Sequence, residues 1–173
     1  MNDNITIRTA KPSEFKNIGK LMVKVYSNLA GFPSESEQPE YYKLLLNIGD
    51  LTKLERTELL VAISEKNEVM GAVVYFSDMG VYGSGGSATQ EKNSSGFRLL
   101  AVDPKFRSKG VGRKLSLACI EKAKKDGNSQ LIIHSTEFMK IAWRMYENIG
   151  FQRAEDLDFM QEKLPVYGFS YRF

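Results

Sequence analysis

The sequence predicts an α/β protein in which strands and helices alternate along one chain. Short apolar or alternating runs typical of strands are interleaved with segments whose apolar residues recur every three to four positions, as in helices. The order is strand, helix, helix, three strands, helix, strand, helix and two strands. The 173 residues suit one domain with a substantial core, so we expect a single domain over residues 1–173.

The N-terminal part is predicted to form a strand and two helices. Residues 5–9 alternate as a strand does. A helix is predicted after Pro12, which helix starts tolerate, and residues 31–33 (Gly-Phe-Pro) end it. Residues 34–39 form a polar loop, and we expect a second helix from Glu40 to about Leu54.

The middle of the chain is predicted to form strands joined by short connections. Residues 59–63 and 69–76 are strands around a hairpin turn at residues 65–67. Residues 78–95 are rich in Gly, Ser and Asn and are expected to be an extended connection. Residues 97–102 are apolar and rich in strand formers, and this strand stops at Asp103-Pro104.

The C-terminal part is predicted to contain two helices and three strands. Residues 110–126 form a helix with lysines near its negative end and Gly127 as its cap. Residues 130–134 form a strand, and residues 137–148 form a helix that Gly150 ends. Residues 151–157 and 166–173 are expected to supply a last antiparallel pair.

The turn between the strand at residues 97–102 and the following helix is the most informative feature. It reads Arg107-Ser108-Lys109-Gly110-Val111-Gly112, so two glycines leave room for a ligand beside the backbone. A helix N-terminus offers free N–H donors and a positive dipole end to an anion. Positive charge is added by Arg107, Lys109, Arg113 and Lys114. We therefore predict a site for a phosphate-bearing ligand.

Two common phosphate-binding motifs do not explain this turn. No segment supplies the Gly-x-x-x-x-Gly-Lys-Ser/Thr of a Walker A loop. A dinucleotide fingerprint that starts at Gly110 would need Gly or Ala where Leu115 stands. Residues 83–88 match that fingerprint formally, but no helical pattern follows them, so the match is interpreted as chance.

Two ordered blocks resemble the GNAT superfamily of acetyl-CoA-dependent N-acetyltransferases. Its signature is Arg/Gln-x-x-Gly-x-Gly/Ala after a strand ending in Ala-Val-Asp-Pro, which matches residues 101–112 here. The second block, Ala-x-x-x-Tyr-x-x-x-Gly-Phe, matches Ala142, Tyr146, Gly150 and Phe151. The specific resemblance covers residues 96–151. It implies a mixed, mostly antiparallel sheet flanked by helices, with splayed fourth and fifth strands.

The resemblance also implies how acetyl-CoA would bind. The pantetheine arm fills the gap between the splayed strands and hydrogen-bonds backbone groups of one of them, here those of Leu100, Ala101 and Val102. The pyrophosphate lies against the N–H groups of the turn, beside Arg107. Those groups belong to Ser108, Lys109, Gly110, Val111, Gly112 and Arg113. The alternative is an ordinary buried strand, turn and helix with no ligand.

Tyr146 matches the family tyrosine that protonates the coenzyme A thiolate. A phenol with a pKa near ~10 can protonate a thiolate whose conjugate acid has a pKa near ~8.5. The alternative is a core aromatic whose hydroxyl has a protein partner. Many relatives carry Asn seven residues earlier, where it contacts the pantetheine arm, but this chain has Met139. A side-chain hydrogen bond from that position is therefore not expected.

His134 is the only histidine, at the end of the strand before the last helix. In some relatives a carboxylate that acts as general base stands at this place, twelve residues before the tyrosine. With an ordinary pKa near ~6.5, His134 could remove a proton from an ammonium through water, which Ser135 or Thr136 could position. The alternative is a structural histidine at the strand end.

The acceptor site implied by the resemblance lies around the first two helices and their loop. Carboxylates beside aromatic rings would suit a cationic amine, whereas the alternative is a solvated acidic loop. The residues concerned are Phe32, Glu35, Glu37 and Glu40, with Tyr26, Tyr41 and Tyr42 nearby. The acceptor itself is not identified by this pattern.

Composition limits the remaining classes. The net charge of +3 without a dense basic block argues against nucleic-acid binding. One cysteine, Cys119, excludes an internal disulfide and a cysteine-rich metal site. No export signal or membrane span is recognisable, so a cytoplasmic location is expected. The expected partners are acetyl-CoA and an amine, with no metal, no nucleic acid and no membrane, and a homodimer is left open.

The leading hypothesis is therefore an acetyl-CoA-dependent N-acetyltransferase acting on a primary amine of a small molecule or peptide by direct attack in a ternary complex. One alternative is transfer of another acyl group, such as succinyl. Another is a non-catalytic module with the same fold that senses acyl-CoA or serves as an interaction scaffold.

Overall fold

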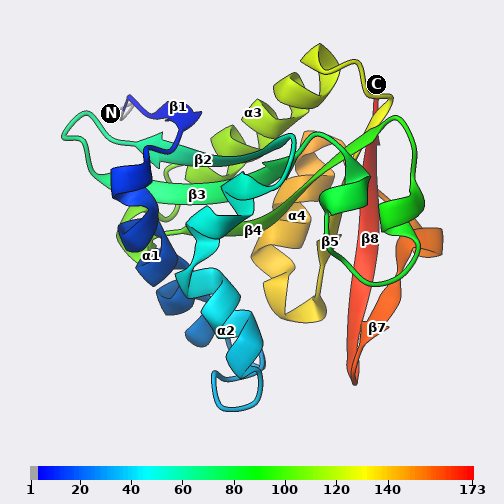
Figure 1. Ribbon diagram of the computed structural model, residues 1–173, viewed down its shortest axis with the longest axis horizontal. Helices are drawn as coiled ribbons and strands as arrows, with labels where there is room; N and C mark the ends of the chain where they lie inside the picture. The colour runs from blue at the N-terminus through cyan, green and yellow to red at the C-terminus, as the bar shows by residue number, and fades with distance from the viewer. Residues whose placement is uncertain (1–3) are drawn as a thin grey trace.

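The computed structural model describes residues 4–173 and contains an eight-stranded mixed sheet (Figure 1). The strand order is β1-β2-β3-β4-β5-β8-β6, and β7 also pairs with β8. Only β4 and β5 run parallel; the other pairs are antiparallel. The strands are β1 (Thr6–Thr9), β2 (Thr57–Ile63), β3 (Val69–Phe76), β4 (Ser94–Val102), β5 (Gln130–Ser135), β6 (Gln152–Arg153), β7 (Phe159–Gln161) and β8 (Leu164–Arg172). The predicted fold class is confirmed, while residues 1–3 of the expected domain lie outside the described residues.

Two pairs of helices cover the two faces of this sheet. Buried side chains of α1 and α2, such as Met22 and Leu45, belong to one core cluster. They come from apolar residues spaced so that they lie on one face of each helix. Buried side chains of α3 and α4, such as Leu115 and Tyr146, join a second cluster on the opposite face, where Cys119 is also buried. The helices are α1 (Phe15–Ser27), α2 (Pro39–Leu46), α3 (Val111–Lys125) and α4 (Lys140–Ile149).

The fourth and fifth strands separate along their length, as predicted. β4 and β5 pair through only three residues each, and the last pair joins Gly96 to Ile132. β5 continues to pair with β8 as far as Ser135 opposite Tyr167. β4 continues beside β3, but Leu99 adopts a left-handed φ of 60°, and the register with β3 shifts around it. Past Gly96, no strand of residues 4–173 pairs with the edge of β4 that faces β5.

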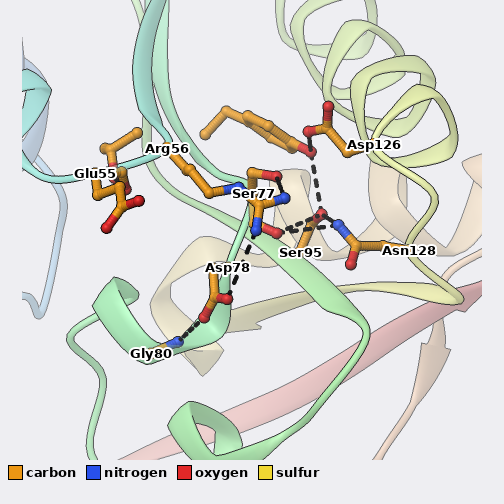
Figure 2. Close-up of polar contacts among 10 residues, drawn as sticks. Glu55, Arg56, Ser77, Asp78, Gly80, Ser95, Asp126 and Asn128 are labelled. Atoms are coloured by element: carbon orange, nitrogen blue, oxygen red, sulfur yellow. Dashed lines mark hydrogen bonds and ion pairs between the residues drawn. The ribbon is translucent and has the colours of Figure 1, made fainter.

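A polar network lies at the end of β4 where this strand still pairs with β5 (Figure 2). The Tyr75 hydroxyl donates to a carboxylate oxygen of Asp126 at 2.7 Å and lies 3.0 Å from the Ser95 hydroxyl. The side-chain amide of Asn128 donates to the Ser77 carbonyl at 3.0 Å and also to the Ser95 hydroxyl. The network joins β3, β4 and the end of α3, so the strands are fixed at one end and open towards the other.

The predicted helix from Glu40 to about Leu54 is wrong as a single helix. It consists of α2 and a separate 3-10 helix, Ile48–Lys53, with a break at Asn47. The second piece packs closely on α1, since a Cβ added at Gly49 would lie 2.3 Å from the Phe15 ring. Tertiary packing therefore overrides the continuous helical pattern.

Three further segments differ from the sequence interpretation. The predicted connection at residues 78–95 contains two 3-10 turns, Met79–Val81 and Ala88–Gln90, and buries Tyr82 completely. The predicted last helix starts with a 3-10 turn, Glu137–Met139, before α4. In the last antiparallel pair, residues 151–157 supply only the two-residue β6, and β7 forms the hairpin with β8. Among residues 4–173, no helix is both long and apolar enough to cross a membrane.

Gly19 sets how closely α1 approaches α2, because a Cβ added there would lie 2.0 Å from the Leu46 carbonyl oxygen. Gly19→Ala should lower the free energy of unfolding by about 1–3 kcal/mol, since overpacking outweighs the better helix propensity of alanine. Urea unfolding measures this change. Asn17→Ala, on the exposed face of the same helix, is the control and should stay within about 0.5 kcal/mol of wild type. Equal stability of Gly19→Ala and wild type would contradict the close packing.

Candidate active site

A cavity of about 130 Å³ opens where β4 and β5 separate. Its walls come from α1, β4, β5, α4 and the β7–β8 hairpin, with Tyr82 from the 78–95 segment. A larger, more external cavity of about 400 Å³ adjoins it, and the two share Phe32, Tyr41, Gln161 and Leu164. The gap in the sheet is therefore connected to the surface between the helix α1–α2 loop and the β7–β8 hairpin.

Tyr146 on α4 lines the inner cavity and is 5% exposed. Its ring packs against Phe97 and Phe151, with centroids 5.8 and 5.7 Å away. The backbone N–H groups of Gly150 and Phe151 both donate to the Tyr146 carbonyl, which explains the sequence register of these residues. Among the described residues its hydroxyl has no hydrogen-bond partner. Burial raises the pKa of this hydroxyl well above its usual value, so the phenol is neutral.

His134 lines the same cavity, but both of its ring nitrogens have protein partners. Nδ1 lies 3.0 Å from the Tyr82 hydroxyl, and Nε2 lies 2.9 Å from the Leu157 carbonyl oxygen. A carbonyl can only accept, so the proton is assigned to Nε2, and Nδ1 accepts from Tyr82. Burial lowers the pKa of His134 below its usual value, and the charge of Arg98 adds to that effect. The imidazole is therefore neutral.

Two hydroxyls in the cavity wall are buried without a partner. Ser135 and Thr136 are 2% and 5% exposed, and neither side-chain oxygen has a hydrogen bond in the described part of the chain. An unsatisfied buried polar group costs roughly 1–3 kcal/mol. Both residues line the inner cavity, but their hydroxyl oxygens are covered by the protein. Met139 lies beside them and offers no side-chain donor.

The open edge of β4 passes directly along this cavity. Leu100 lines it, and Ala101 and Val102 follow on the same strand. The Tyr26 hydroxyl of α1 donates to the Leu100 carbonyl at 3.3 Å. That carbonyl keeps one further lone pair, and no strand covers the edge towards β5. An extended ligand can thus bind there as a strand would.

Beyond β4 the chain forms the predicted turn into α3. Asp103 starts the turn by accepting from the Lys105 N–H at 2.9 Å. Ser108 and Gly110 have left-handed φ angles of 64° and 80°, an arrangement that directs successive N–H groups into one concavity. Within residues 4–173, no hydrogen-bond acceptor lies opposite the N–H groups of Gly110, Val111 and Gly112. The exposed cations here are Arg107, Lys109, Arg113 and Lys114. The turn is suited to an anion.

The comparisons with known proteins agree with this arrangement. The model of the acetyltransferase (GNAT) family matches residues 22–151. The chain belongs to this family. The predicted resemblance to GNAT acetyltransferases is thereby confirmed, and it extends to the fold as a whole.

Individual relatives are distant in sequence. The chain is 29% identical over 101 residues to the uncharacterized N-acetyltransferase YjgM of Escherichia coli, a match that spans 57% of this chain and 59% of that protein. A GNAT acetyltransferase structure from Staphylococcus aureus Mu50 aligns with a TM-score of 0.74 and 17% identity over 98% of this chain and 99% of the other. The PaiA N-acetyltransferase of Thermoplasma acidophilum, solved with coenzyme A, gives a TM-score of 0.71 and 15% identity over 98% and 99%.

The GNAT fold brings some predicted site residues together and separates others. Leu100, His134 and Tyr146 meet at the inner cavity, whereas the turn at residues 107–112 lies outside it, at the end of β4. Arg98 and Tyr82 also line the cavity and were missed by the sequence analysis. A charged residue inside an apolar strand could have pointed to Arg98. Nothing in the polar segment around Tyr82 indicated a role. Among the described residues, no three His, Cys, Asp or Glu side chains are grouped to hold a metal ion.

Gly110→Val tests the turn as a binding site for coenzyme A. A side chain at this position should block close approach of a pyrophosphate and abolish acetyl-CoA binding, as measured by calorimetry. Gly127→Val is a matched control: Gly110 and Gly127 have φ angles of 80° and 79°, and an added Cβ meets nothing within 4 Å at either. Both variants therefore carry similar backbone strain, and only the first should lose affinity. Unchanged affinity in folded Gly110→Val would exclude this turn as the site.

Proposed function

We propose that this chain transfers the acetyl group of acetyl-CoA to a primary amine of a small molecule or peptide, by direct attack in a ternary complex. One observation carries the proposal: a neutral tyrosine, Tyr146, whose hydroxyl has no hydrogen-bond partner among the described residues, lies in the gap between β4 and β5. That gap continues along the edge of β4, which no described strand covers, to a turn where the N–H groups of Gly110, Val111 and Gly112 have no acceptor within residues 4–173.

The residues of this chain fit acetyl-CoA, which when bound would supply an activated acetyl thioester. Backbone groups of Leu100, Ala101 and Val102 would bind the pantetheine arm along the open edge of β4. The N–H groups from Ser108 to Arg113 and the guanidinium of Arg107 would bind the pyrophosphate. Met139 leaves the arm without a side-chain amide, so the backbone contacts carry that part of the binding.

Tyr146 is proposed as the general acid. Its raised pKa keeps the phenol protonated until the thiolate departs beside it; the thiolate, whose conjugate acid has a pKa near ~8.5, is the weaker base and takes this proton at an energetic cost. The hydroxyl has no acceptor among the described residues that would compete for this proton. A tyrosine hydroxyl at the gap with no partner among the described residues is the arrangement a proton donor needs, and it favours catalysis over a sensing or scaffold role.

His134 is proposed to receive the proton of the acceptor amine through Tyr82. The Tyr82 hydroxyl passes its own proton to His134 Nδ1 and takes one from the amine or from an intervening water. The imidazolium that results keeps its hydrogen bond from Nε2 to the Leu157 carbonyl. Ser135 or Thr136 would hold that water once a side-chain rotation turned its hydroxyl, which is covered in this structure, towards the cavity.

Tyr146→Phe tests the general acid because it keeps the ring contacts with Phe97 and Phe151 and removes only the donor. Release of free thiol, with acetyl-CoA and a panel of amines, should slow by roughly 10²–10⁴-fold. Acetyl-CoA affinity is the internal control and should stay unchanged. Near-normal turnover, with chemistry shown to limit the rate, would leave Tyr146 a core aromatic.

Replacing acetyl-CoA with succinyl-CoA in the same assay tests whether the chain transfers a succinyl group instead of an acetyl group.

The pH profile of kcat/KM for the acceptor tests His134. A base must be unprotonated, so activity should rise with pH through the His134 pKa, which lies below its usual 6.5. In His134→Ala this acidic limb should shift or vanish while acetyl-CoA affinity stays nearly constant. Tyr82→Phe breaks the same proton path and should lower kcat/KM to a similar extent. An unchanged acidic limb in both variants would assign that limb to the amine itself.

A further inference from the structure

Three arginines are half-buried in the described part of the chain: Arg8, Arg98 and Arg153. Two of them hold a carboxylate with two hydrogen bonds. Arg8 binds Glu14 at 2.6 and 3.1 Å, and Arg153 binds Asp158 at 2.7 and 2.8 Å. This is the usual way in which a chain compensates a guanidinium that has lost part of its water.

Arg98 differs from the other two because no carboxylate of residues 4–173 pairs with it. One of its terminal nitrogens donates to the Tyr82 carbonyl at 2.8 Å, and its guanidinium lies over the Tyr82 ring at 5.6 Å. A guanidinium has five N–H donors, so most of them remain available. Arg98 lines the inner cavity. Among the described residues that line this cavity, Arg98 carries the only charged side chain.

The charge balance of that wall bears on the acceptor. None of the described residues that line the inner cavity is acidic, and His134 is neutral. An amine that enters as an ammonium would therefore meet an uncompensated positive charge in a place with little water. The acidic side chains near the path, Glu37 and Glu162, line only the outer cavity. A ligand that brings its own negative charge removes this repulsion.

We propose that the acceptor is an amine with a carboxylate close to its amino group, as in a free amino acid, and that Arg98 binds this carboxylate. The proposal rests on the proposed function. Arg98 directly precedes Leu99 and Leu100 on β4, where the open edge begins to line the cavity. The carboxylate must therefore lie within a side chain's reach of the attacking nitrogen.

The decisive experiment compares free L-amino acids with their α-carboxamides as acceptors, with free thiol as the readout. Wild type should show a kcat/KM roughly 10²-fold or more higher for the carboxylates, because a site with a buried donor set discriminates strongly against ligands that leave it unpaired. Arg98→Met should reduce this ratio to near one without weakening acetyl-CoA binding. Arg98→Lys keeps the positive charge but loses the planar guanidinium that can bind a carboxylate through two hydrogen bonds. This variant should show an intermediate ratio of carboxylate to carboxamide rates.

Arg8→Met is the matched control, because it removes another half-buried arginine far along the sheet from the cavity, and its acceptor ratio should equal that of wild type. Arg98→Lys also keeps the test valid should Arg98→Met not fold. Equal rates for carboxylates and carboxamides, or a preference for carboxamides or peptides, would overturn the Arg98 inference while the proposed function stands. Thiol release from neither set, with acetyl-CoA bound, would overturn both.

Discussion

The separation of β4 and β5 is the constraint on which the rest of this structure depends. A parallel pair that stayed together would close the sheet, satisfy its backbone groups and leave no place for a ligand. Here the pairing stops at Gly96 and Ile132 because Leu99 turns β4 towards β3 while β5 remains on β8. The network around Ser95 and Asn128 joins β3, β4 and the end of α3 beside the segment where β4 and β5 still pair. Both core clusters then reach the gap from opposite faces.

Several polar groups that normally have hydrogen-bond or ion-pair partners in a folded protein lie together at the gap. The hydroxyls of Ser135, Thr136 and Tyr146 lack partners in the described chain, and Arg98 lacks an acid. Elsewhere the same kinds of groups are paired, as Arg153 is with Asp158. Such local departures from the usual pairing rules are expected at functional sites, where the remaining structure supplies the stability.

The sequence predicted the parts of the fold that local pattern determines. Apolar spacing located α1, α3 and α4 within a few residues and the start of α2, but not its end; the turn glycines predicted an anion site, which remains a proposal. Local patterns could not show that the predicted second helix divides at Asn47 or that its second piece packs on Phe15, because that contact joins residues far apart in the chain. The hydrogen bond between Tyr82 and His134 could not be predicted for the same reason. Tyr82 belongs to a polar segment distant in sequence, which lies beside β5 only in the folded chain. Tyr146 was found because its register with Gly150 is local.

The unpaired edge of β4 also has a bearing on solubility. An exposed strand edge normally recruits strands of other molecules and starts aggregation, so proteins shorten, charge or cover such edges. In this chain the edge lies inside the molecule, between Tyr26 of α1 on one side and Tyr146 of α4 on the other. In this enclosed position the edge is not presented to the strands of other molecules. The fold thus keeps the unpaired edge of β4 open to a ligand without exposing it to other protein molecules in a crowded solution.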